Sequence, residues 1–192
     1  IIIPSNSELC TIENAFLNSA IKSIEIPPSV FELKEYWFRG MTHLIDVTVM
    51  PNSKYFRNIG YIVLGKSDIK NDEFDDLVFV PNCIATFETP PSIKRILSGV
   101  FACSSIEVIH ILPQVTHIND CAFEKCHHLT KVEIPKDSNL QSIGNISFYN
   151  TSIESIFIPS HVKVIGDLAF SKCANLTHVE IPSDSELQTI SK

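Results

Sequence analysis

Apolar and polar positions follow one another in a fixed order that returns about every 23 residues along the chain. The clearest copy runs from His161 to Pro182 and reduces to V-x-x-I-G-x-x-A-F-x-x-C-x-x-L-x-x-V-x-I-P. The residues before the final proline alternate between apolar and polar, which predicts a short strand with one buried face. Proline cannot donate to a strand ladder, so Pro182 is expected to end that strand.

Two independent sets of residues mark the same period. Prolines stand at the strand end in five copies, and phenylalanines recur mostly about 22 residues apart. In two further copies Met50 and Leu112 hold the place of the proline, which follows one residue later. The prolines are Pro4, Pro27, Pro135, Pro159 and Pro182, and the phenylalanines are Phe16, Phe38, Phe79, Phe101, Phe123, Phe148 and Phe170.

Each copy predicts the same three pieces of structure. The strands are expected at 21–26, 44–49, 84–89, 106–111, 129–134, 153–158 and 176–181. A second, shorter extended stretch follows each proline, as in 162–165, and Gly144 and Gly166 suit a bend that needs unusual backbone angles. The Ala-Phe-x-x-Cys segment fits a single helical turn that drives its Phe inward. Because one copy cannot bury its own apolar residues, successive copies should stack with their strands in a parallel sheet.

A small residue three positions before the buried Leu or Ile is expected inside each turn. Asn and Cys interchange there, which indicates a small polar group that bonds backbone left unpaired by the coil. These residues are Asn18, Met41, Pro81, Cys103, Cys126, Asn150 and Cys173. Together with the seven phenylalanines, Cys126 and Cys173 form the predicted core of the repeat.

One interval breaks the period, and it predicts an irregular long repeat over 51–90. Two apolar runs, 52–65 and 77–80, surround the polar segment 66–76. This pattern indicates a β-hairpin-like insert near 52–80. Insertions in repeat proteins usually map to one face and are often functional.

The repeating unit resembles the BspA-like class of leucine-rich repeats, which occur in bacterial surface antigens and protozoan surface proteins. The match is specific over 115–135 and 162–182, and the insert is similar to a longer unit of that class, with an N-x-x-Y-x-x-x-x-G segment from Asn52 to Gly60. The resemblance implies a right-handed leucine-rich-repeat solenoid with a parallel β-sheet on one face. It also implies a binding or adhesion role at a cell surface and brings no catalytic residue or cofactor. We expect 1–192 to form a single domain, cut from a longer array.

Composition narrows the classes of partner. The formal net charge is −7 and the basic residues are scattered, which argues against nucleic acid. No run of about 18 apolar residues occurs, so we expect no membrane insertion by this stretch. The chain shows no signal segment, and only the resemblance favours a cell-surface or secreted location. The six cysteines are too dispersed to predict a disulfide framework, and they leave the redox compartment open.

The outward strand positions are the candidate binding surface. Glu recurs on alternate strands, and exposed Val108, His110 and Phe157 are expected to anchor a partner, since the inner faces of solenoids commonly bind other molecules. The predicted partner-binding face comprises Glu88, Val108, His110, Lys131, Glu133, Phe157, His178 and Glu180. The alternative is an ordinary solvated sheet face.

A crowded group of His and Cys residues suggests a metal site. It contains His117, Cys121, Cys126, His127 and His128, but it lacks the tight paired spacing typical of zinc ligands. An ordinary turn is the preferred interpretation, so we expect no metal. The histidines sit at unrelated points of the unit, and no phosphate-binding glycine motif occurs, so neither a catalytic site nor a cofactor is predicted.

Three N-x-[ST] triplets begin at Asn145, Asn150 and Asn175. Asn145 is the better candidate for glycosylation if the chain is exported, because Asn150 is expected inside the turn.

The sequence therefore predicts a non-enzymatic repeat protein that recognises a protein or another cell-surface macromolecule through its sheet face. Two alternatives remain, a structural spacer and an intracellular scaffold, in both of which the sheet face binds nothing.

Overall fold

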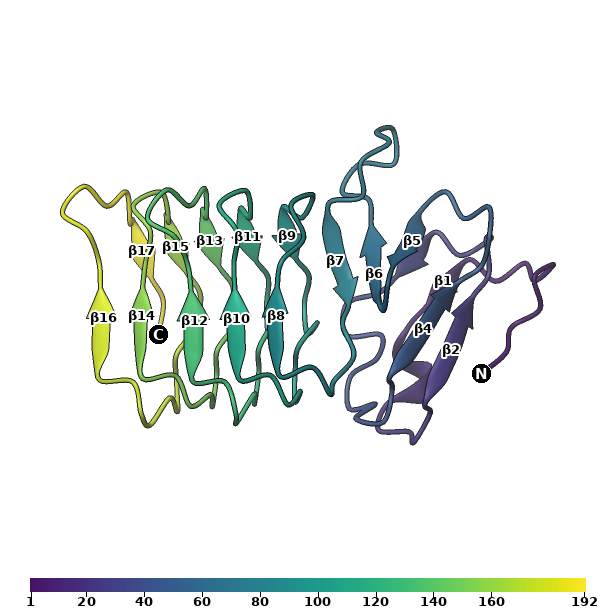
Figure 1. Ribbon diagram of the computed structural model, residues 1–192, viewed down its shortest axis with the longest axis horizontal. Coiled ribbons are helices and arrows are strands. Elements are labelled where there is room, and N and C mark those ends of the chain that lie inside the picture. Colours follow the sequence, from purple (N-terminus) through teal and green to yellow (C-terminus); the bar gives the residue numbers. More distant parts are fainter.

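The computed structural model describes all 192 residues as a stack of coils (Figure 1). Each coil supplies a strand, a turn and a second strand of two residues. All seven predicted strands are present, although each is slightly shorter than predicted. They are β2 (Ser23–Ile26), β4 (Asp46–Val49), β8 (Thr86–Glu88), β10 (Val108–His110), β12 (Lys131–Glu133), β14 (Ser155–Phe157) and β16 (His178–Glu180).

The second strands form the longer sheet. They are β1 (Thr11–Ile12), β3 (Glu32–Leu33), β9 (Arg95–Ile96), β11 (His117–Ile118), β13 (Ser142–Ile143), β15 (Val164–Ile165) and β17 (Thr189–Ile190). Five of them join three longer strands in one eight-stranded sheet in the order β17-β15-β13-β11-β9-β7-β6-β5. The seven strands predicted from the sequence do not form one continuous sheet. They form three separate parallel sheets, β2-β4, β8-β10-β12 and β14-β16.

The insert is an antiparallel meander of β5 (Phe56–Ile59), β6 (Ile62–Gly65) and β7 (Asp76–Phe79). A two-residue turn, Gly60-Tyr61, joins the first pair, and Gly60 supplies the left-handed φ of 58° that such turns require. β7 then pairs in parallel with β9 and so returns the chain to the repeat. The hairpin predicted from the two apolar runs is confirmed as the β6–β7 pair, and the first run supplies a third strand because it divides into β5 and β6.

β6 and β7 divide the hydrophobic core, and all their residues are buried. Val63, Val78 and Phe79 belong to an N-terminal cluster of 13 buried residues, while Leu64 and Leu77 belong to a C-terminal cluster of 29. Both faces of these strands are therefore buried, which explains why their sequences lack polar alternation.

The phenylalanine rings of the C-terminal coils form one stack. Phe101, Phe123, Phe148 and Phe170 have centroid separations of 4.9, 5.0 and 5.4 Å and interplanar angles of 4–5°. The other three depart from the expected column. Phe38 meets Phe79 edge to face at 5.5 Å, Phe79 lies on β7 rather than in a turn, and Phe16 is only partly buried. The insert interrupts the column because it replaces the turn of one coil.

The turns are held by hydrogen bonds between coils rather than by helix. Only η1 (Asn14–Phe16) is helical, as a single 3₁₀ turn, so the predicted helical turns are mostly hydrogen-bonded bends. The N–H groups of Phe101, Phe123 and Phe148 donate to the carbonyls of Ala122, Ser147 and Ala169 in the following coil, at 2.8, 2.7 and 2.9 Å. Left-handed φ of 55–73° occurs two residues before and two residues after five of the phenylalanines, whereas Phe16 has only the later position and Phe79 has neither. The earlier positions are Tyr36, Gly99, Cys121, Ile146 and Leu168, and the later ones are Asn18, Gly40, Cys103, Lys125, Asn150 and Lys172.

The polar position inside the turn was predicted one residue too early in several coils. The thiols of Cys126 and Cys173 donate to the carbonyls of Phe101 and Phe148 at 2.8 and 3.0 Å, as the pattern suggested. The neighbouring coils use Ser104 and Thr151, which contact these sulfurs at 3.6 and 3.2 Å. In those coils one residue fewer separates the Phe from the strand, so Cys103 and Asn150 occupy the left-handed positions instead. Asn18 also occupies a left-handed position. In the coil after the insert, the Asn82 side chain, rather than Pro81, takes the polar position and donates to the Met41 carbonyl at 3.2 Å.

Gly144 and Gly166 are required for close approach, not for unusual backbone angles. Neither has a left-handed φ, but an added Cβ on Gly144 would come within 2.6 Å of the backbone of Asn119 and Asp120. A Cβ on Gly166 would come within 2.6 Å of the Asn145 backbone nitrogen. The coils stack too closely here for any side chain.

Candidate functional site

The strands β8, β10, β12, β14 and β16 lie side by side (Figure 1), and their register aligns the outward residues in two columns that cross the strands. Strand register places His110 beside Glu88 and Glu133, and it places Phe157 beside Glu180. The neighbouring column places Val108 beside Thr86 and Lys131, and Ser155 beside His178. β12 and β14 are not paired by hydrogen bonds, but they are in contact, so the two columns continue from β12 to β14.

A small charged network lies in the middle of this face. His110 Nδ1 is 2.6 Å from Glu133 Oε2, and Lys131 Nζ pairs with Glu133 Oε1. The hydrogen bond from Lys131 and then the contact with His110 lower the pKa of Glu133 below its ordinary value. The carboxylate of Glu133 is therefore paired within the protein, whereas the carboxylates of Glu88 and Glu180 form no ion pair.

The face is hollowed into a shallow groove of about 410 Å³ between β8 and β14. Glu88, His110, Glu133 and Phe157 all line it, so the structure brings together four residues chosen from sequence. Its apolar lining consists of Val132 on β12 and of residues that follow β10 and β12, namely Ile111, Leu112, Pro113, Ile134 and Pro135. The strand-ending residues were read from sequence only as strand terminators, and their place in the groove was missed.

The other four predicted residues lie outside the groove. Val108 is half-buried rather than exposed, and so are His110 and Phe157 in the groove. Lys131 is exposed beside Glu133. His178 and Glu180 are exposed on β16 and extend the columns toward the C-terminal end.

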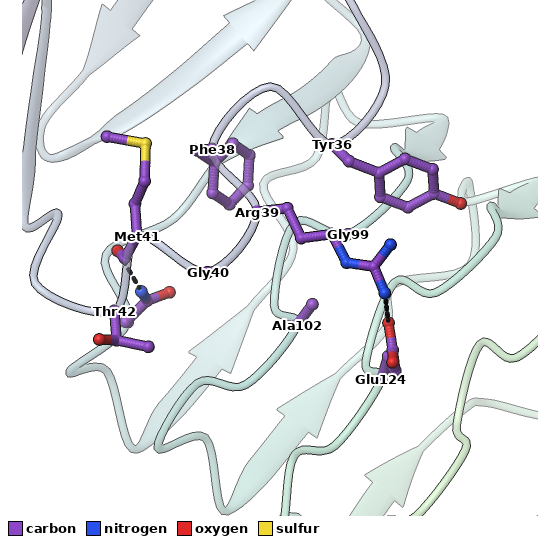
Figure 2. A pocket seen from close by; sticks show the side chains of 10 residues that line it. Tyr36, Phe38, Arg39, Gly40, Met41, Thr42, Gly99, Ala102 and Glu124 are labelled. Carbon is purple, nitrogen blue, oxygen red and sulfur yellow. Dashed lines mark hydrogen bonds and ion pairs between the residues drawn. The ribbon is translucent and has the colours of Figure 1, made fainter. Parts of the chain in front are cut away.

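A second hollow lies on the turn side, where the N-terminal coils meet the C-terminal ones (Figure 2). Arg39 extends over the Tyr36 ring and reaches the buried Glu124 carboxylate at 3.4 Å. The Tyr36 hydroxyl donates to Cys121 Sγ at 3.6 Å, and burial raises the pKa of Tyr36 above its ordinary value. The enclosed space is about 10 Å³, enough for one water molecule, so these contacts join the two parts of the stack. Sequence reasoning missed them because the paired residues are 85 positions apart.

The crowded His and Cys residues do not converge. Cys126 is fully buried against the Phe101 carbonyl, Cys121 contacts Tyr36, and His127 and His128 are exposed in a turn. The structure contains no group of three or more His, Cys, Asp or Glu arranged to hold a metal ion. All six cysteines are free.

Asn145 is already engaged in a ladder between coils. Its amide donates to Asp120 Oδ2 at 3.0 Å and accepts from the Asp167 N–H at 2.7 Å. Asn150 is half-buried, whereas Asn175 is exposed. No helix in the structure has the length and apolar character needed to cross a bilayer.

The stacked coils, the parallel strands and the period of about 23 residues define a leucine-rich-repeat solenoid. The model of the BspA type leucine rich repeat region matches residues 1–79 and 94–192, in six copies. The chain belongs to this family.

Solved structures show the same fold. The pneumococcal vaccine antigen PcpA aligns with a TM-score of 0.83 at 22% identity, over 94% of this chain and 44% of that one. A leucine-rich repeat protein from Eubacterium ventriosum aligns with a TM-score of 0.74 at 22% identity, over 97% and 59%. A leucine-rich cell surface protein from Faecalibacterium prausnitzii aligns with a TM-score of 0.71 at 23% identity, over 98% and 56%. The chain spans about half the length of these proteins. Among curated protein sequences none matches the chain.

Proposed function

We propose that this chain binds a protein or another cell-surface macromolecule through the outward residues of β8, β10, β12, β14 and β16, without catalysing a reaction. The groove between β8 and β14 carries the proposal, because it combines an apolar floor with polar groups at its edges. Interfaces commonly depend on a few aromatic anchors surrounded by polar residues, and Phe157 has that position.

Only the similarity to solved structures bears on the cellular location of this chain. One similar structure is described as a vaccine antigen and another as a cell surface protein. These descriptions support a cell-surface setting for this chain as part of the same proposal.

The test compares the wild type with the double variant His110→Ala, Phe157→Ala. Binding of each protein to an array of purified extracellular proteins is measured by biolayer interferometry. We expect binding to weaken by about tenfold or more, since anchor residues dominate such interfaces. Val164→Ala is the matched control, because Val164 is exposed on β15, outside the groove.

Binding that is unchanged in the double variant would place the partner elsewhere and overturn the proposal. The absence of any binding across the array would favour the structural spacer.

A further inference from the structure

Three carboxylates lie in one line across the strands, two of them in the groove and the third, Glu180, beyond its C-terminal end. Glu88, Glu133 and Glu180 stand on β8, β12 and β16, with one strand between each pair. Adjacent strands of a ladder are about 4.8 Å apart, so Glu88 and Glu133 are separated by about 10 Å. β12 and β14 form no ladder, but β13 and β15 of the same two coils are paired, so the coils keep this spacing and Glu180 continues the line at a similar interval.

A ligand that lies across the strands must present its cations at the same interval. A polyproline II helix repeats every three residues with a rise of about 3.1 Å per residue, which gives about 9.3 Å per turn. A β-strand returns a side chain to the same face every ~6.7 Å, and this interval drifts out of step with the carboxylates. The spacing therefore matches a polyproline II segment with a basic residue at every third position.

The remaining groove residues fit the same ligand. Phe157 is half-buried between Glu133 and Glu180, and Pro113 and Pro135 line the rim. Aromatic-lined grooves are a common site for proline-rich segments, whose preformed conformation lowers the entropic cost of binding. The chain has a formal net charge of −7, which also favours the approach of a basic partner.

We infer that the groove and the adjoining Glu180 bind a proline-rich peptide segment in the polyproline II conformation, with Lys or Arg at positions i, i+3 and i+6. This inference rests on the proposed function and names the chemistry of its partner. The outer cations meet Glu88 and Glu180, which have no partner in the protein. The middle cation faces Glu133, where Lys131 and His110 already supply positive charge or hydrogen bonds, so it contributes least.

The test uses capped peptides and the isotopically labelled protein, with binding followed by NMR chemical shifts. The probe is acetyl-Arg-Pro-Pro-Arg-Pro-Pro-Arg-amide. A control of the same composition has its three Arg adjacent, a second replaces Pro by Gly, and a third replaces Arg by Glu. We expect the probe to shift the signals of Glu88, Phe157 and Glu180 and each control to bind at least about threefold more weakly, since register, preorganisation and charge each contribute.

The variant Glu88→Gln, Glu180→Gln should weaken binding of the probe by about three- to tenfold, a modest loss typical of exposed ion pairs. Glu107→Gln, Glu154→Gln is the matched control, because it removes two exposed carboxylates at strand entrances, outside the groove. It should leave the affinity unchanged.

Equal binding of the probe and of any control peptide would overturn the inference, and so would unchanged binding to Glu88→Gln, Glu180→Gln. If the peptides fail while His110→Ala, Phe157→Ala still weakens binding of a protein partner, only the polyproline II inference is wrong. If neither effect is seen, the proposed binding face is wrong as well.

Discussion

At the scale of single residues, each position of the repeat has a definite structural role. A residue that departs from the repeat at such a position is therefore expected to lower the stability of the fold. Ser147 is fully buried and its hydroxyl has no hydrogen-bond partner. Ala122 and Ala169 hold the same place in the coils on either side. The repeat unit has Ala at this position, and the structure shows why a polar atom there gains nothing.

Ser147→Ala should stabilise the protein by about 1 kcal/mol, because an unpaired buried hydroxyl costs free energy that its removal restores. Urea denaturation measures the change. Ser138→Ala is the control: Ser138 is equally buried, but its hydroxyl accepts from the Leu140 N–H at 3.2 Å, so its loss should destabilise. Destabilisation by Ser147→Ala would show that the hydroxyl has a partner, such as a buried water.

Phe123→Ala should reduce the free energy of unfolding by about 3–5 kcal/mol, as in other buried phenylalanine truncations. Its ring lies between Phe101 and Phe148 and has no exposed surface. Phe16→Ala provides the comparison, and its loss should be smaller because Phe16 is only partly buried and is stacked on no other ring. Similar losses for the two variants would contradict the importance of the stack.

At the scale of elements, the insert shows how a repeat can be interrupted without leaving an unpaired edge. The Asn58 side chain on β5 acts like the peptide group of a missing strand. Its Oδ1 accepts from the Val49 N–H at 2.7 Å, and its Nδ2 donates to the Val47 carbonyl at 2.8 Å. The amide thus closes the edge of β4, where the next parallel strand would otherwise pair.

Asn58→Ala should destabilise the protein by about 1–3 kcal/mol, because it leaves one N–H and one carbonyl of β4 unpaired in a partly buried site. Thermal and urea denaturation measure the loss. Asn139→Ala is the matched control, since Asn139 is exposed and its side chain forms no hydrogen bond. A loss no greater than that of the control would show that water replaces the amide.

The loop between β6 and β7 is closed by Asp75. Burial alone would raise the pKa of this carboxyl, but hydrogen bonds from the Ser67 N–H at 2.9 Å and hydroxyl at 2.8 Å, with Lys94 at 3.7 Å, hold the pKa below its ordinary value. A lowered pKa in the folded protein stabilises it above the unfolded value of about 3.9, and this stability is lost as the pH falls through the folded pKa.

Ser67→Ala should therefore raise the pKa of Asp75 and destabilise the protein at pH 7. At a pH below the folded pKa of Asp75, where the carboxyl is protonated in both states, the two proteins should differ less. Urea denaturation at the two pH values measures this. Ser29→Ala, which removes a hydroxyl bonded to the Leu9 carbonyl at 2.7 Å, should show no such pH dependence. An equal loss from Ser67→Ala at both pH values would exclude ionisation as its cause.

At the scale of the whole molecule, the chain is a linear stack in which each coil contacts mainly its neighbours. The coils of β10–β13 are covered on both sides, whereas every residue of β16 and β17 is exposed. Stability should therefore vary along the stack rather than be uniform.

Amide hydrogen exchange should be slowest around β11 and β13 and fastest in β17, because opening the last coil exposes few buried side chains. Exchange measured by NMR tests this order. A uniform rate from β9 to β17 would instead indicate that the whole stack opens as one cooperative unit.

The period, the seven strands and the stacking of the phenylalanines in the C-terminal coils could be predicted from the sequence, because each follows from a local pattern repeated many times. The hairpin could be predicted from the one interval that breaks this pattern, whereas the departure of Phe16, Phe38 and Phe79 from the stack could not. The tertiary structure alone decided that the second strands form the longest sheet, that β6 and β7 divide the core, and that Arg39 reaches Glu124. It also brought Glu88, His110, Glu133 and Phe157 into one groove with the residues that follow the strands. These features depend on how coils of unequal length stack on one another, and a pattern within one coil carries no information about contacts that only stacking creates.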